Sequence, residues 1–186
     1  MRFISVLFCV LCLSSTALAA QSFPESWSET QIRLDAFAQD IAAFDGECGK
    51  VQKRFDTTGF LFTEFSVYEF KSLVKYKRDV AEASYGKANS SLAELELRQL
   101  EIREQCFKLL GRGRTLVTDF LLLAGYYDTE NPERSQLARQ GASRAKELLI
   151  KAWERLIMIK FLENVCQREQ EALDWLEKAL AGNSPS

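Results

Sequence analysis

An apolar rhythm with alternating steps of three and four residues constrains the fold of this chain more than any other feature. Its first run consists of Leu34, Phe37, Ile41, Phe44, Cys48, Val51 and Phe55. Steps of three and four place side chains on one face of an α-helix, whereas a strand needs steps of two. We therefore expect a long amphipathic helix that is capped near Ser26 or Ser28 and ends at Thr57-Thr58-Gly59.

The same rhythm returns twice in the second half of the chain. One run consists of Leu95, Gln99, Ile102, Cys106, Leu109, Gly113, Leu116, Phe120 and Leu123. The other consists of Ala138, Ala142, Ala145, Leu149, Ala152, Leu156, Ile159, Cys166, Leu173 and Leu180. Between them we expect a loop at 127–130, after which Asn131 caps a helix that starts at Pro132 and is stopped by Gly182.

An aromatic segment separates the first two runs, and its members are Phe60, Phe62, Phe65, Tyr68 and Phe70. Aromatic residues favour strands, but a single strand among helices would have no partner, so we expect a helix over 61–84 in the centre of a bundle. Residues 85–91 then form either a turn or a weak point in one very long helix. The predicted fold is all-α, an antiparallel bundle of about four long helices.

The first nineteen residues have the pattern of a secretory signal peptide. Arg2 is followed by the apolar run Phe3–Leu13, which is too short to span a bilayer, and by the cleavage pattern Ala17-Leu18-Ala19. An uncleaved anchor is the alternative. We expect an exported protein, periplasmic or extracellular, with a single domain over 20–186. Removal of Arg2 leaves 23 basic and 26 acidic side chains, a net charge of −3.

Cleavage would also leave three cysteines, which are Cys48, Cys106 and Cys166. If the chain turns back near Gly86, the rise of about 1.5 Å per helical residue brings Cys106 to about the level of Cys48. If residues 60–124 were one helix, the two would lie far apart. We therefore predict a Cys48–Cys106 disulfide, with Cys166 as a free or intermolecular thiol.

Composition excludes several classes of function. The chain has no histidine, so it cannot hold a Ser-His-Asp triad or a histidine-ligated metal. Its net charge of −2 and isoelectric point near 5.4 argue against nucleic-acid binding. We predict no catalytic residues, no metal and no cofactor.

Two local clusters carry weaker predictions. Backbone amides and the guanidinium groups of Arg112 and Arg114 would contact an anion if a helix started there, but glycines 111 and 113 more simply predict a kink. Gln99 and Glu163 both fall on apolar seams, and we expect them to form a buried polar pair that fixes helix register.

The stretch from Leu148 to Leu162 contains eleven apolar residues in fifteen. Its charged side chains exclude a simple membrane span. Attachment to a membrane surface remains open, with Lys151, Arg155 and Lys160 reaching the headgroups. We favour a central helix on which the other helices pack.

Residues 171–180 resemble the second helix of a tetratricopeptide repeat, with Ala172, Leu176 and Ala179 at the family's small, large and small positions. Residues 122–127 are similar to the end of a first helix. The resemblance covers about 116–183 and implies repeat-like helical hairpins that bind a peptide or protein.

Two functions follow as hypotheses. The first is a non-enzymatic helical interaction or scaffold protein in an envelope or secreted assembly, with the aromatic segment at 60–70 gripping a partner helix. The second is a bundle that binds a lipid or small molecule, with the same segment lining the cavity. Association with further copies of the chain is left open.

Overall fold

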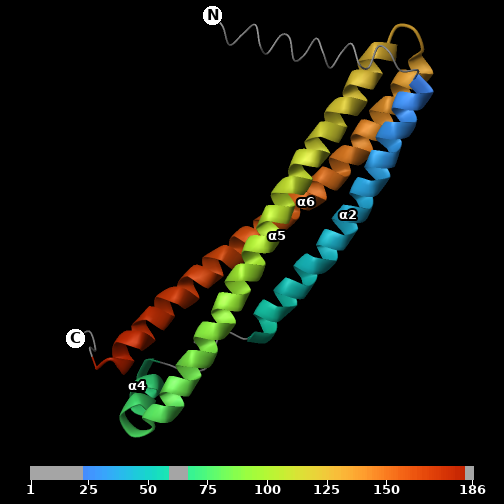
Figure 1. Ribbon diagram of the computed structural model, residues 1–186. Helices are drawn as coiled ribbons and strands as arrows, with labels where there is room; N and C mark the ends of the chain where they lie inside the picture. Colours follow the sequence, from blue (N-terminus) through green and yellow to red (C-terminus); the bar gives the residue numbers. More distant parts are fainter. Residues whose placement is uncertain (1–22, 59–66, 183–186) are drawn as a thin grey trace, which may run out of the picture. The chain divides into compact units, whose positions relative to one another are not determined.

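A computed structural model describes residues 23–58 and 67–182, and in these ranges it contains four α-helices and no strand (Figure 1). The helices are α2 (Phe23–Thr58), α4 (Val67–Tyr76), α5 (Arg78–Tyr127) and α6 (Pro132–Leu180). The predicted all-α helical bundle is confirmed. The predicted signal peptide at 1–19 lies outside the described residues, as do Phe60, Phe62 and Phe65.

The helices pack in two compact units, and α2, α5 and α6 each contribute a segment to both. Of the described residues, those up to Asp40 and those from Leu109 to Ile150 form the first unit, and those from Ile41 to Lys108 and from Lys151 onward form the second. The α2 seam is confirmed in both units, because all seven of its predicted members are buried.

The first unit packs the aromatic rings of α2 and α5 against small residues of α6. Phe37 and Phe120 are completely buried, and the ring of Trp27 meets that of Phe120 edge-on at 5.6 Å between centroids. The small residues are Ala138, Gly141, Ala142 and Ala145. A Cβ atom added to Gly141 would lie 2.4 Å from a ring carbon of Phe120, so only glycine allows this ring to pack here.

The predicted boundaries of α6 are confirmed. The backbone N–H of Arg134 donates to Oδ1 of Asn131 at 3.1 Å, so Asn131 is the N-cap and Pro132 the first helical residue. At the other end Gly182 has a φ of +78°, and its N–H donates to the carbonyl of Ala179. Only glycine adopts this left-handed backbone without strain, which explains why the helix stops there.

The second unit encloses a core from α2, α4, α5 and α6. Phe44 and Cys48 of α2, Cys106 of α5 and Ile159 of α6 are among its buried side chains. Phe70 of α4 is also buried, so this part of the aromatic segment belongs to the core and not to a partner-binding surface. The side chain of Tyr68 lies outside the described residues.

Of the two alternatives for residues 85–91, the long helix is confirmed and the turn is wrong, because these residues are helical within α5 and the helix is interrupted at Lys77 instead. The residues that share one buried face across this region are Ala81, Ala88, Leu92 and Leu95. Their packing outweighs the weak helix propensity of glycine, asparagine and serine at 86–91, which is at most about 1 kcal/mol per residue. In the part of the chain that the structure describes, the bundle therefore has three long helices and a short one.

Gln99 places an unpartnered amide in the second unit. Its side chain is 4% exposed, and within the described residues its Nε2 has no hydrogen-bond partner. A buried donor without a partner costs about 1–3 kcal/mol.

We expect Gln99→Met, which keeps the volume and removes the donor, to raise the free energy of unfolding by about 1 kcal/mol. Urea denaturation measures this, and the exposed Gln105→Met should change nothing. A loss of stability on Gln99→Met would contradict the prediction.

Candidate interaction groove

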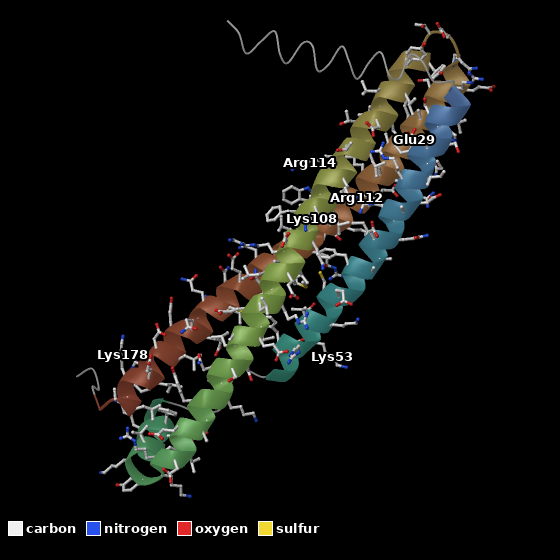
Figure 2. All side chains as sticks on the ribbon, in the orientation of Figure 1. Glu29, Lys53, Lys108, Arg112, Arg114 and Lys178 are labelled. Carbon is white, nitrogen blue, oxygen red and sulfur yellow. The ribbon has the colours of Figure 1, made fainter. Side chains whose placement is uncertain are left out.

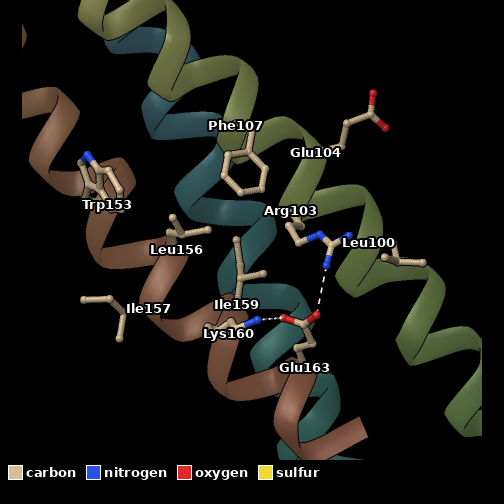
Figure 3. Close-up of a pocket in the computed structure, with 10 residues that line it drawn as sticks. All are labelled: Leu100, Arg103, Glu104, Phe107, Trp153, Leu156, Ile157, Ile159, Lys160 and Glu163. Atoms are coloured by element: carbon tan, nitrogen blue, oxygen red, sulfur yellow. Dashed lines mark hydrogen bonds and ion pairs between the residues drawn. The ribbon is translucent and has the colours of Figure 1, made fainter. Parts of the chain in front are cut away.

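A groove of about 790 Å³ lies between α5 and α6 of the second unit (Figure 3). Its lining consists of Leu100, Arg103, Glu104, Phe107, Trp153, Leu156, Ile157, Ile159, Lys160 and Glu163. Most of this surface is hydrocarbon, and four of its large apolar side chains are exposed even though the unit already has a core: Leu100, Phe107, Trp153 and Ile157. The groove is therefore an apolar surface left uncovered by the fold.

Helical periodicity explains why these side chains point outward. On α6, Ile159 and Cys166 are seven residues apart and face the core, whereas Trp153, Ile157 and Phe161 follow steps of four on the opposite side. On α5, Leu100 and Phe107 are again seven residues apart and fall beside the buried row that contains Cys106. Each helix thus carries a second apolar row in addition to the one that it buries.

One end of the groove holds a triad of charges. Figure 3 shows Arg103 of α5 and Lys160 of α6 converging on Glu163, at 3.0 Å to Oε1 and 2.8 Å to Oε2. The hydrogen bond from Lys160 lowers the pKa of Glu163 below its usual value. At the α5 rim Glu104 pairs with Lys108 at 2.7 Å. The triad keeps one net positive charge, because two cations share a single carboxylate, and the rest of the lining is mainly apolar.

We expect Lys160→Met to raise the pKa of Glu163 toward its usual value, since the substitution removes the hydrogen bond that lowers it. Because that pKa is lower in the folded protein than in the unfolded chain, the ionised form contributes stability above the unfolded pKa. The contribution is lost as the pH falls through the folded pKa. Carboxyl NMR titration measures the shift. Glu104, whose pKa is lowered by Lys108, is the internal control and should not move. An unchanged pKa of Glu163 would contradict the assignment.

The predicted disulfide is absent from the structure, in which Cys48, Cys106 and Cys166 are free and buried. The pKa of Cys48 is raised to about 12, mainly by burial, and the charge of a Cys106 thiolate contributes to the rise. Burial also raises the pKa of Cys106 and of Cys166 to about 11. Such thiols are poor nucleophiles at neutral pH. The Cys48–Cys106 pairing stays a prediction.

The predicted anion site requires a helix that starts at residues 111–114, and no helix starts there. Residues 111–114 lie inside α5, and their backbone amides belong to that helix. The helix is not interrupted at these residues, where a kink was expected. Arg112 and Arg114 lie on the α5 stretch of the first unit (Figure 2). Arg112 forms an ion pair with Asp40, and its guanidinium lies 5.9 Å from the ring centre of Phe37. Its charge is therefore already engaged.

Two other expectations need correction. Gln99 and Glu163 do not form a register pair, because Glu163 is bound by Arg103 and Lys160. Neighbouring helices do not cover every face of the stretch from Leu148 to Leu162, because Trp153, Ile157 and Phe161 are exposed. The high apolar content of this stretch was the available signal for the groove. The sequence alone favours a fully buried helix for this stretch, because periodicity does not show how many faces of a helix have neighbours.

No family model, curated protein or solved structure matches this chain. The resemblance of residues 116–183 to tetratricopeptide-type hairpins therefore stays a prediction. In the described ranges, no group of three or more histidine, cysteine, aspartate or glutamate side chains has a geometry suited to a metal ion. None of the described helices has both the length and the apolar content needed to cross a bilayer.

Proposed function

We propose that the protein is an exported, non-enzymatic helical interaction protein, an accessory component of an envelope or secreted assembly. In this proposal a protein partner docks in the groove between α5 and α6. The single observation that supports it most is the exposure of large apolar side chains along this groove, beside a core that is complete without them. Contiguous exposed apolar surface of this kind is typical of protein-binding sites.

The chemistry of the groove is consistent with this role. The groove's ion pairs join its charges to one another or to its rim, and they leave one net positive charge that an acidic side chain of a partner would match. Phenylalanine, tryptophan and arginine, which are enriched at protein interfaces, all occur in the lining. The partner that fits best is an amphipathic helix, whose apolar row would lie along the groove.

Photo-crosslinking in the native host tests this proposal. A photoreactive phenylalanine analogue at Ile157 should form a covalent adduct with a defined protein. The same analogue at the exposed Gln52 of α2 should not. The adduct should disappear when Trp153→Asp is added, because a carboxylate in the groove is poorly tolerated in an apolar interface. Equal adducts at both positions, or adducts that survive Trp153→Asp, would contradict the proposal.

Export rests on the signal-peptide pattern at 1–19, and the three cysteines offer a test of it. Passage through an oxidising compartment should join Cys48 to Cys106, which are both buried in the second unit, and leave Cys166 unpaired. Peptide mapping of the native protein without reduction should recover this link. A Cys106–Cys166 link, or three free thiols, would argue against the pairing.

Binding of a lipid or small molecule is the second candidate, and the volume of the groove favours it. About 790 Å³ lies within the range of ligand pockets, about 300–1,000 Å³. Such pockets usually enclose most of the ligand, whereas Ile157 and Phe107 are largely exposed here. Saturable binding of a fluorescent fatty acid that Trp153→Asp abolishes would favour this function over protein docking.

A further inference from the structure

The groove has an apolar end and a charged end. The thiol of Cys106 on α5 donates to the carbonyl of Ala152 on α6 at 3.3 Å, so the next residues, Phe107 and Trp153, lie at about the same level. Their rings form the apolar end. The charged end begins at Lys160, seven residues after Trp153, which is about 10.5 Å along the helix. A ligand of the groove therefore meets apolar and charged surface about two helical turns apart.

The charged end has more hydrogen-bond donors than its own carboxylate can use. Arg103 and Lys160 both bind Glu163, at 3.0 and 2.8 Å, so one net positive charge remains. A lysine has three N–H donors and an arginine five, whereas a carboxylate accepts about four hydrogen bonds. The side chain of Lys160 is 70% exposed, so its ammonium group can be reached from solvent. A second carboxylate can therefore join these three residues through charge-assisted hydrogen bonds.

Helix α2, which lies behind the groove in Figure 3, shows what chemistry covers another face of the same helices. Its buried row contains Phe44 and Cys48, and Asp45 beside this row forms an ion pair with Arg155 of α6. Arg155 lies five residues before Lys160, which is about 140° around the helix. The covered face thus combines an apolar row with a carboxylate that matches a cation of α6. The open face presents the apolar row and the cation, and it lacks the covering helix with its carboxylate.

We infer that the occupant of the groove is an amphipathic helix of a partner protein that carries an acidic residue two turns from its apolar anchor. The anchor lies between Phe107 and Trp153, and a second apolar residue of the same row lies over Ile157. The carboxylate meets Lys160 and Arg103. Along α6 these contacts fall at positions i, i+4 and i+7, which is the spacing that one face of a docked helix presents. This inference rests on the proposed function, because it gives the chemistry of the partner in the same groove.

Binding of synthetic peptides to the native protein tests the inference. The peptide is an alanine-rich helix with leucine at positions i and i+4 and glutamate at i+7, held helical by a lactam bridge on its opposite face. It is made in both sequence directions, each with a control in which glutamine replaces the glutamate. Fluorescence anisotropy should show saturable binding of a glutamate peptide, and its glutamine control should bind about fivefold more weakly. Failure of both glutamate peptides to bind, or equal binding of glutamate and glutamine peptides, would overturn the inference.

Substitutions in the triad change its net charge in single steps. Glu163→Gln adds one positive charge, and Lys160→Met removes one. We expect the first to tighten binding of the glutamate peptide about fivefold and the second to weaken it by about the same factor. The glutamine peptide should respond to neither by more than about twofold. Lys178→Met is the matched control, because Lys178 is exposed on α6 away from the groove (Figure 2), and it should change neither affinity. A glutamate peptide indifferent to both triad variants, whose circular dichroism is unchanged, would contradict the inference.

The outcomes also separate this inference from the proposed function. A Trp153-dependent adduct from position 157 that Lys160→Met leaves unchanged, with peptide binding that ignores charge, overturns the acidic helix and keeps the proposed function. Absence of both peptide binding and a groove-dependent adduct overturns both. Saturable, Lys160-dependent binding of oleate without binding of either peptide overturns the inference in favour of a small anionic amphiphile. A dimer that Ile157→Asp dissociates, again without peptide binding, overturns it in favour of a second copy of the chain.

Discussion

Phe120→Ala is expected to lower the free energy of unfolding by about 3–5 kcal/mol. The ring of Phe120 is completely buried in the first unit, where it meets Trp27 edge-on and lies against the backbone of Gly141. Removal of the ring leaves a cavity that small neighbours such as Ala138 and Ala142 cannot fill. Urea denaturation followed by circular dichroism measures the loss.

Phe107 supplies the matched control on the same helix. It is more than half exposed, so Phe107→Ala should change the free energy of unfolding by at most about 0.5 kcal/mol. The same substitution on α5 should therefore have very different consequences at two positions. If the two variants lost equal stability, the division of α5 into a buried row and an exposed groove row would be wrong.

Gly141→Ala is expected to lower the free energy of unfolding by about 2 kcal/mol, although alanine is the better helix former. The added Cβ would lie 2.4 Å from one carbon of the Phe120 ring and 2.6 Å from another. Because this ring is enclosed on all sides, it cannot move without displacing its neighbours. The steric term therefore exceeds the gain in helix propensity.

Two further variants test this explanation. Gly111→Ala on α5 meets no heavy atom within 4 Å, so it should raise the free energy of unfolding by about 0.5–1 kcal/mol. In the Phe120→Ala background the steric conflict is gone, and Gly141→Ala should then be neutral or stabilising. Additive losses in the double variant would show that Phe120 is not the cause.

Local sequence signals predicted the ends of α6 well, whereas the expected caps of α2 at Ser26 or Ser28 are wrong, because α2 begins at Phe23. Asn131 and Pro132 begin α6 and Gly182 ends it, because a side-chain cap and a left-handed backbone act within a few residues. The seam from Leu34 to Phe55 is buried as predicted, because a regular helical period leaves only one face for the core. Such features need no information from distant parts of the chain.

The sequence leaves a turn and one long helix as alternatives at 85–91, because the choice between them depends on contacts with distant parts of the chain. Gly86 and the polar residues after it have weak helix propensity, but Ala81 and Ala88 continue the buried face of α5 across them. Alanine is small and common on helix surfaces, so its burial is not evident from composition. The packing of a neighbouring element decides such a case.

The sequence by itself determined the helical class of this protein, the face that α2 buries and the ends of α6, because those properties follow from periodicity and short-range hydrogen bonds. Only the tertiary structure decided which apolar side chains of α5 and α6 are covered. Trp153 and Leu162 are both large apolar residues of α6, yet Trp153 lies in an open groove and Leu162 lies in the core. The physical reason is that burial depends on which neighbours pack against each face of a helix, and a single helix carries no record of them.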